Sequence, residues 1–177
     1  MGQDSKMSTH PDHTAFVCLG SNLGDAEGNL ALARKGLAAL ADVRLVCASS
    51  VYMTEPQDHA EQPWFRNQVV QLWLGARYQP EALLRDLLEL EARLGRVRST
   101  DPALRYGPRC IDIDLLLFDA LRLETPFCTL PHPRMTRRAF VLEPLAEIAP
   151  GLAVAGKPVE AWLARLSYRR EGSRIFQ

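Results

Sequence analysis

The spacing of apolar residues predicts four strands and two helices in the first two thirds of the chain. Segments that alternate apolar and polar residues, or that are rich in apolar and β-branched types, indicate strands at 15–19, 43–53, 67–74 and 111–118. Leucines recur at helical spacing over 30–40 and 83–94, which predicts two amphipathic helices. Asp25 and Pro80 are typical of helix starts, and Gly95 is typical of a helix end.

The resulting order, β-α-β-β-α-β, predicts an α+β fold with a ferredoxin-like core, in which two helices cover one face of an antiparallel sheet. Additional C-terminal helices are expected over 137–148, interrupted at Pro144, and over 159–166, after a short hairpin return at 121–123. We expect residues 1–13, which are polar, to be a disordered leader or an expression remnant, and residues 14–177 to form a single domain.

Composition narrows the class of protein without indicating an activity. Lys and Arg together number 21, as do Asp and Glu, so the formal net charge is +0 and no overall field favours nucleic acid or a membrane surface. No stretch approaches the ~20 apolar residues of a membrane helix. The four cysteines are widely spaced and mostly lie in apolar runs, which favours buried thiols in a reducing, cytoplasmic compartment.

One segment of the chain combines two carboxylates with several arginines. Asp112 and Asp114 alternate with apolar residues, so on an extended strand they share one face and lie ~7 Å apart. Mg²⁺ typically takes one or two protein carboxylates and completes its shell with water and phosphate oxygens. The arginines that precede the strand are Arg96, Arg98, Arg105 and Arg109. Their planar charged groups match phosphate, so the segment predicts a site for a metal-bound polyphosphate.

A structural explanation of the same segment competes with this hypothesis. Arginine-rich loops are usually solvated, and Asp-x-Asp is often only the wet face of an edge strand. Function is favoured because the rigid Gly107-Pro108 turn delivers Arg109 to the strand, while the apolar run 115–118 anchors that strand in a core. Long loops are often functional, and three are expected to converge on the acidic strand: 54–66, 95–109 and 124–137.

Two other clusters leave structure and function open. Trp64, Phe65 and Asn67 would suit a flat heterocycle with a hydrogen-bonding edge, although spacing alone favours aromatic residues that cap the core. For His132 and the arginines that follow it, the two explanations are evenly balanced. Arginines at a helix start oppose the preference of the helix dipole, which indicates an anion nearby.

Two further features favour a structural role. Glu91 lies on the second predicted helix, where a glutamate normally faces solvent. The segment 20–24, Gly-Ser-Asn-Leu-Gly, lacks the spacing of phosphate-binding glycine loops and indicates turn chemistry.

Seven motifs occur in an order that resembles one known family. They are LGSNLG at 19–24, YMTEP at 52–56, FRN at 65–67, GRVR at 95–98, YGPR at 106–109, DIDLLLF at 112–118, and PH followed by RAF between 131 and 140. From about Ala15 to Pro150, the chain resembles the 6-hydroxymethyl-7,8-dihydropterin pyrophosphokinases of folate biosynthesis. The resemblance implies transfer of the terminal pyrophosphoryl group of ATP to the hydroxymethyl oxygen of the pterin, with release of AMP and with two Mg²⁺ ions.

The resemblance also implies roles for individual residues. Asp112 and Asp114 would hold both metal ions, and with Arg98, Arg105 and Arg109 they would form the catalytic set. The ATP-binding residues would be Glu91, Arg98, Arg109, Ile113, Thr129, His132 and Arg138. The pterin-binding residues would be Thr54, Asp58, Phe65, Asn67, Tyr106 and Phe140, with the pterin between the two phenylalanines.

Some positions depart from the family pattern, and other functions remain open. The loop between Arg98 and Arg105 is longer than in short bacterial members, Pro133 replaces a frequent tyrosine, and Phe127 stands where an arginine can occur. A metal-dependent phosphodiesterase or nuclease is the main alternative, disfavoured by the neutral charge. A non-catalytic ferredoxin-like binding module is the third. We expect a monomer that acts on pterin and ATP without a nucleic-acid or membrane partner.

Overall fold

A seven-stranded, mostly antiparallel sheet forms the centre of the protein, whose computed structural model describes residues 11–56, 62–97 and 107–177. Its strands are β1 (His13–Ser21), β2 (Val43–Ala48), β3 (Tyr52–Thr54), β4 (Phe65–Leu74), β5 (Asp112–Phe118), β10 (Arg169–Glu171) and β11 (Arg174–Phe176). They pair in the order β10-β11-β3-β4-β1-β5, and β2 also pairs with β4. Every pair is antiparallel except β11 with β3.

The single strand predicted over 43–53 is wrong, because the structure divides it into β2 and β3. The division lies at Ser49, whose backbone N–H donates to the Val69 carbonyl at 2.9 Å and whose hydroxyl accepts from the Val69 N–H at 3.1 Å. A side chain thus replaces a backbone partner, which interrupts the regular ladder. Both strands still pair with β4, so the predicted order of elements is otherwise present.

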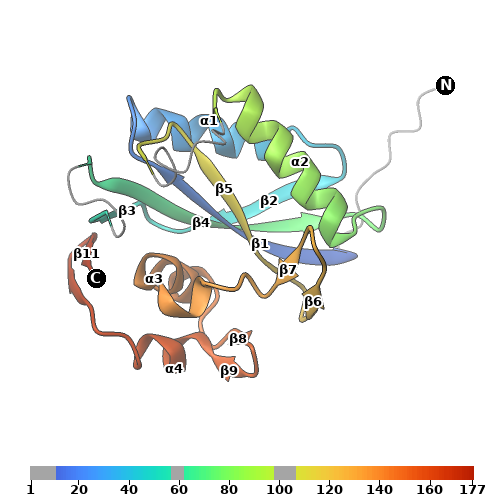
Figure 1. Ribbon diagram of the computed structural model, residues 1–177. Helices are drawn as coiled ribbons and strands as arrows, with labels where there is room; N and C mark the ends of the chain where they lie inside the picture. Colours follow the sequence, from blue (N-terminus) through green and yellow to red (C-terminus); the bar gives the residue numbers. More distant parts are fainter. Residues whose placement is uncertain (1–10, 57–61, 98–106) are drawn as a thin grey trace.

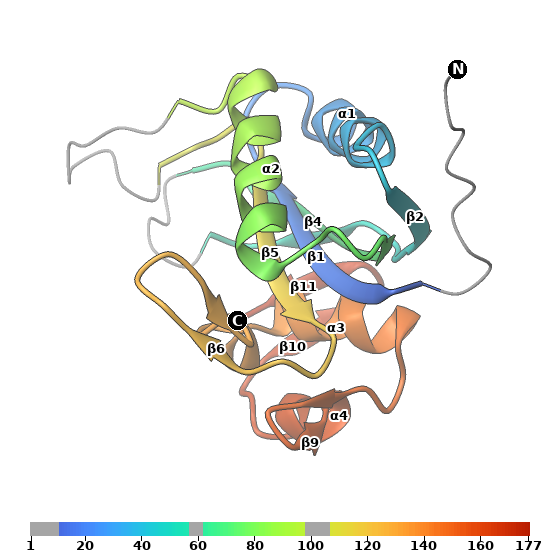
Figure 2. The same cartoon turned by 90° about the vertical axis from the view of Figure 1, so that its right-hand side faces the viewer.

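Helices cover both faces of the sheet, whereas the sequence placed two helices on one face and did not say where the additional C-terminal helices pack. On one side lie α1 (Ala26–Ala38) and α2 (Pro80–Arg93), and on the other lie α3 (Ala139–Ile148) and α4 (Val159–Leu163) (Figure 1). Figure 2 shows α2 running along β5, with α3 on the opposite side of the sheet.

The physical reason for the second helical layer is visible in the central strands. In β1, alternate residues enter different cores: Ala15, Val17 and Leu19 pack below α1 and α2, while Phe16 and Cys18 pack against α3 and α4. A strand that is apolar on both faces requires a cover on each side. The nearly continuous apolar run of β1 is therefore a sequence signal for two covered faces, which the predicted fold did not take into account.

The C-terminal part of the chain departs from several predicted boundaries. A 3₁₀ turn (Met135–Arg137) precedes α3, which continues through Pro144 without interruption, and α4 ends at Leu163. Two small hairpins are present: β6 (Leu123–Glu124) with β7 (Thr129–Leu130), and β8 (Ala153–Val154) with β9 (Lys157–Pro158). The β10–β11 hairpin was not predicted.

The first strand overlaps the predicted leader, residues 1–13, by a single residue. Strand β1 begins at His13, whose Nδ1 atom lies 2.8 Å from a carboxylate oxygen of Asp119. Residues 1–10 lie outside the described part of the chain. No helix among the described residues is both long enough and apolar enough to span a membrane.

Candidate active site

The register of three strands gathers the candidate residues on the face of the sheet that α3 covers. Gly20 of β1 lies opposite Asn67 of β4 and opposite Asp112 of β5, and Cys18 lies opposite Asp114. Directly paired residues of neighbouring strands project to the same face, as do residues two apart on one strand. The two carboxylates therefore face α3, while Ile113 between them is buried in the core on the other side.

A cleft is formed where this face meets the start of α3. The residues that line it are Cys18, Gly20, Thr54, Glu55, Gln62, Phe65, Asn67, Arg109, Asp112, Asp114, Arg138 and Phe140. Its empty space, open solvent included, is about 570 Å³. The cleft brings together residues predicted for the metal, phosphate and pterin sites.

The floor of the cleft depends on a glycine. A Cβ atom added at Gly20 would lie 2.9 Å from the Asn67 Oδ1 atom, closer than real contacts allow. Asn67 is 4% exposed, and its Nδ2 atom donates to the Thr54 hydroxyl at 2.7 Å. This bond fixes the amide, so that Asn67 and Thr54 present a preorganised polar edge within the cleft.

Asp112 is held between two arginines. Its carboxylate forms an ion pair with the Nε atom of Arg96 at 3.2 Å and another with the Nε atom of Arg109. Burial raises the pKa of Asp112 and the nearby Asp114 adds to this, whereas Arg109 and Arg96 oppose the rise. The Asp114 side chain makes no hydrogen bond or ion pair with the described residues. Arg96 was noted in the sequence but was not assigned to the site.

Two aromatic side chains on different elements line the same cleft. Phe65 comes from the start of β4 and carries the Arg109 guanidinium over its ring at 4.8 Å. Phe140 comes from the first turn of α3 and carries Arg138 over its ring at 5.2 Å. Flat apolar faces with cationic neighbours suit a planar, electron-rich ligand next to an anionic group.

A second hollow adjoins the first at Asp114, which lines both. Its other lining residues are Leu84, Leu88, Ile113, Leu115, Phe127, Cys128, Thr129, His132 and Pro133. Burial lowers the pKa of His132, and the positive charges of Arg138 and Arg134 lower it further, while Asp114 opposes them. The His132 Nδ1 atom accepts from the Arg134 N–H at 3.3 Å, which leaves Nε2 as the donor of a neutral ring.

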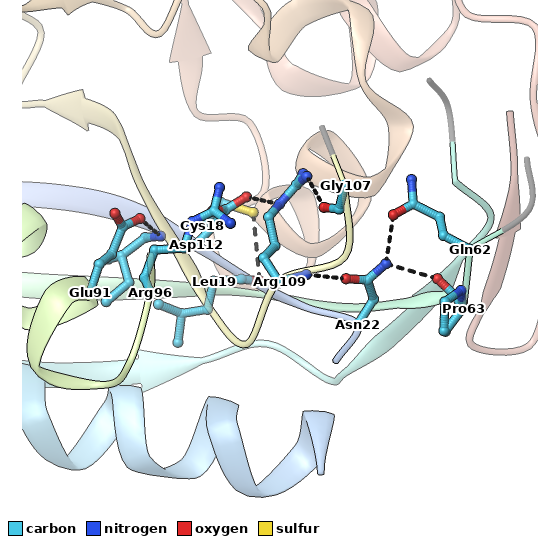
Figure 3. Close-up of polar contacts among 11 residues, drawn as sticks. Cys18, Leu19, Asn22, Gln62, Pro63, Glu91, Arg96, Gly107, Arg109 and Asp112 are labelled. Atoms are coloured by element: carbon cyan, nitrogen blue, oxygen red, sulfur yellow. Dashed lines mark hydrogen bonds and ion pairs between the residues drawn. The ribbon is translucent and has the colours of Figure 1, made fainter. Parts of the chain in front are cut away.

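Asn22 ties three loops together and was missed as a site residue (Figure 3). Its Oδ1 atom accepts from the Arg109 N–H at 2.9 Å, and its Nδ2 atom donates to Gln62 Oε1 at 3.1 Å and to the Pro63 carbonyl at 3.0 Å. Its own N–H donates to the Arg109 carbonyl at 3.1 Å. The segment 20–24 therefore has the structural role that was predicted, and through Asn22 it also positions Arg109 at the cleft.

Glu91 does not face solvent, so that interpretation was wrong. It is 2% exposed, and its Oε1 atom accepts from the Ile113 N–H of edge strand β5 at 2.6 Å. The sequence carried a signal for this burial, because Glu91 follows Leu83 and Leu87 at four-residue spacing on the apolar face of α2. Glu91 thereby fixes the strand between the two acidic residues.

Four predicted site residues, Asp58, Arg98, Arg105 and Tyr106, lie outside the described residues. Within the described ranges, no group of three or more His, Cys, Asp or Glu side chains forms a metal cage. Two carboxylates on one strand face nevertheless fit Mg²⁺, which completes its shell with water and phosphate oxygens.

Comparison with known proteins shows the family that the chain resembles. Residues 16–150 match the sequence model of the 7,8-dihydro-6-hydroxymethylpterin-pyrophosphokinase family. A 2-amino-4-hydroxy-6-hydroxymethyldihydropteridine pyrophosphokinase from Methylorubrum extorquens is 43% identical over 152 residues, which cover 86% of this chain and 92% of the relative. The enzyme of the same name from Bacillus subtilis is 40% identical over 166 residues, which cover 94% of this chain and 92% of the relative.

Solved structures share the fold at low sequence identity. The crystal structure of wild-type Plasmodium falciparum HPPK-DHPS has a TM-score of 0.65 and 14% identity, covering 89% of this chain and 45% of that one. With the family match over most of its length, the chain belongs to the 7,8-dihydro-6-hydroxymethylpterin-pyrophosphokinase family.

Proposed function

We propose that this protein transfers diphosphate from ATP to the hydroxymethyl group of 6-hydroxymethyl-7,8-dihydropterin, giving the pterin diphosphate and AMP in folate biosynthesis. The observation that carries the proposal is the position of Asp114, which lines both adjoining hollows. A group-transfer enzyme must hold donor and acceptor with the reacting atoms close together. Family membership supports this reaction over the phosphodiesterase or nuclease and over a binding module.

The carboxylate pair is the proposed metal site. Asp112 and Asp114 would hold two Mg²⁺ ions, which would neutralise the polyphosphate and activate the pterin hydroxyl as a nucleophile. Asp112 is kept in place by its ion pairs with Arg96 and Arg109. Asp114 is aligned by the β5 backbone, which Glu91 fixes at Ile113.

The pterin would occupy the first hollow. Its ring would lie between Phe65 and Phe140, which both line the cleft, and its polar edge would face Asn67 and Thr54. The hydrogen bond between Asn67 and Thr54 preorganises that edge before the ligand arrives. Asp58 and Tyr106 are proposed to complete the site from segments outside the described residues.

ATP would occupy the second hollow, with its phosphates directed toward Asp114. Ile113, Thr129 and His132 line this hollow, and Glu91 lies behind the same strand. A neutral His132 with Nε2 as donor could hydrogen-bond a phosphate oxygen.

The arginines would bind the phosphates and stabilise charge during transfer, since phosphoryl chemistry depends mainly on positioning and electrostatic stabilisation. Arg109 and Arg138 line the first hollow. Arg98 and Arg105 are proposed for the catalytic set on the basis of their motifs.

The finer features of the fold and setting are also proposals. The order of β2 and β3, β4, β1 and β5, with α1 and α2 on one face, supports a ferredoxin-like core with added C-terminal elements. A monomer in the cytoplasm, without a nucleic-acid partner, stays a prediction.

The proposal is tested by product analysis. With ATP, Mg²⁺ and the hydroxymethyl-pterin, we expect AMP and pterin diphosphate in equal amounts, and no reaction when EDTA removes the metal. Asp112→Ala should nearly abolish this turnover. Release of ADP, or nucleotide cleavage that does not depend on pterin, would contradict the proposal.

A further inference from the structure

A short segment beyond the family match contacts three elements that build the pterin side of the cleft. The family match ends at residue 150, and strand β11, which lies beyond it, pairs in parallel with β3. The Met53 N–H donates to the Ser173 carbonyl at 2.8 Å, and the Glu55 N–H donates to the Ile175 carbonyl at 3.5 Å. These bonds hold the end of β3, where Thr54 and Glu55 line the cleft.

The side chains of the same segment reach the other two elements. Phe176 packs edge-on against Trp64 at 5.3 Å between ring centres, and Trp64 directly precedes Phe65 of the cleft. Ile175 is 1% exposed and packs with Tyr52 of β3 and Ala139 of α3. Segment 173–177 thus packs into the junction of β3, β4 and α3.

Gln177 makes the most specific contact. Its Oε1 atom accepts from the Ala139 N–H at 2.7 Å, and its Nε2 atom donates to the Arg137 carbonyl at 2.9 Å. Ala139 is the first residue of α3, and the residue before it, Arg138, provides no side-chain cap. A distant glutamine therefore caps the helix start, a place where backbone N–H groups otherwise lack partners.

The capped backbone carries two cleft residues. Arg138 lies between the two backbone groups that Gln177 binds, and Phe140 follows one residue after Ala139. Both side chains line the cleft, and the Arg138 guanidinium lies over the Phe140 ring. Because Gln177 bonds the backbone on both sides of Arg138, it restricts how far the start of α3 can rotate.

We infer that segment 173–177 sets the width of the pterin cleft, and that Gln177 is a positioning residue for Arg138 and Phe140. The inference rests on the proposed function, because it assigns the cleft to the pterin. Gln177 acts through the backbone of α3 and does not need to touch the substrate. Loss of its side chain should impair pterin binding more than ATP binding. Phe140 is proposed to contact the pterin directly, whereas Arg138 is one of several groups proposed for the phosphates, and the ATP hollow is lined by other elements.

The test compares three variants. Gln177→Ala removes both contacts, Gln177→Glu keeps the acceptor for the Ala139 N–H but loses the donor, and Arg174→Ala is the control. Arg174 lies in the same segment, 173–177, is exposed, and its side chain makes no hydrogen bond or ion pair with the described residues. The readouts are KM for pterin, KM for ATP, and amide hydrogen exchange at residues 139–142.

For Gln177→Ala we expect pterin KM to rise about fivefold, the ratio that corresponds to one lost helix cap, with ATP KM changed less than about twofold. Amide exchange at 139–142 should become faster by a similar factor. Gln177→Glu should recover much of both effects, and Arg174→Ala should match the wild type.

Faster exchange with unchanged pterin KM would overturn the positioning role and leave only a structural cap. Unchanged exchange at 139–142 would overturn the inference in any case. Should the wild type release no AMP, the proposed function fails, and hydrogen exchange still decides whether Gln177 holds the start of α3.

Discussion

Replacement of Asn22 by alanine tests how the loops position Arg109. The variant loses three side-chain hydrogen bonds, to the Arg109 N–H, to Gln62 and to the Pro63 carbonyl. Each such bond contributes about 0.5–1.5 kcal/mol net, and Asn22 is 4% exposed, so water does not readily replace them. We expect the free energy of unfolding to fall by roughly 2–4 kcal/mol, or about 4–16 °C in melting temperature.

Activity should fall as well, because the lost bond to Arg109 is one of two that fix its backbone. We expect kcat/KM for diphosphate transfer to fall about tenfold, measured by coupled AMP release well below the melting temperature. Asn29→Ala is the matched control: it loses bonds to the Ser21 hydroxyl and the Leu23 carbonyl but none to another loop. If both variants lose stability and neither loses activity, the reasoning about Asn22 is refuted.

Three other changes probe separate parts of the account. Gly20→Ala should raise pterin KM but not ATP KM, because the added Cβ would displace the Asn67 amide, and equal effects on both substrates would count against this view. Phe140→Leu keeps an apolar side chain but removes the flat ring, so pterin KM should rise about three- to tenfold, whereas an unchanged value would exclude ring stacking. For Glu147, burial would raise the pKa, but hydrogen bonds from Ser50 and Tyr52 outweigh it and hold the pKa below 4.5. The stability that Glu147 contributes is therefore present above pH 4.5 and is lost as the pH falls through its lower pKa in the folded state. Glu147→Gln should accordingly have a lower melting temperature than the wild type at pH 6, and the two melting temperatures should converge toward pH 3. A gap in melting temperature that persists at pH 3 would contradict this assignment.

Local periodicity predicted the parts of the fold whose residues repeat regularly. Asp112, Ile113 and Asp114 alternate between the cleft and the core as the strand period requires. The break between β2 and β3 was not predictable from propensity, because it depends on Ser49 meeting Val69 across the sheet. The β10–β11 hairpin escaped detection because it is dominated by exposed charged residues, and Ile175 is its one buried residue.

The candidate site was predictable as a set of motifs but not as a network. The strand period and the neighbouring arginines indicated Asp112 and Asp114, the resemblance supported them, and the structure places both on the cleft. Spacing could not distinguish Arg96 from its neighbours, since only the folded chain shows its ion pair with Asp112. The role of Asn22 depends on three contacts far apart in sequence, which no local pattern encodes.

The central claim is that the carboxylate of Asp114 serves the transfer reaction at the junction of the two hollows. The most direct test is the rate of AMP formation by Asp114→Asn at saturating ATP, pterin and Mg²⁺, with the melting temperature measured in parallel. Asparagine has nearly the same shape, and the Asp114 side chain makes no hydrogen bond or ion pair with the described residues, so stability should be preserved. The account predicts a loss of turnover of at least about 100-fold at an unchanged melting temperature. Turnover within a few fold of the wild type would contradict it.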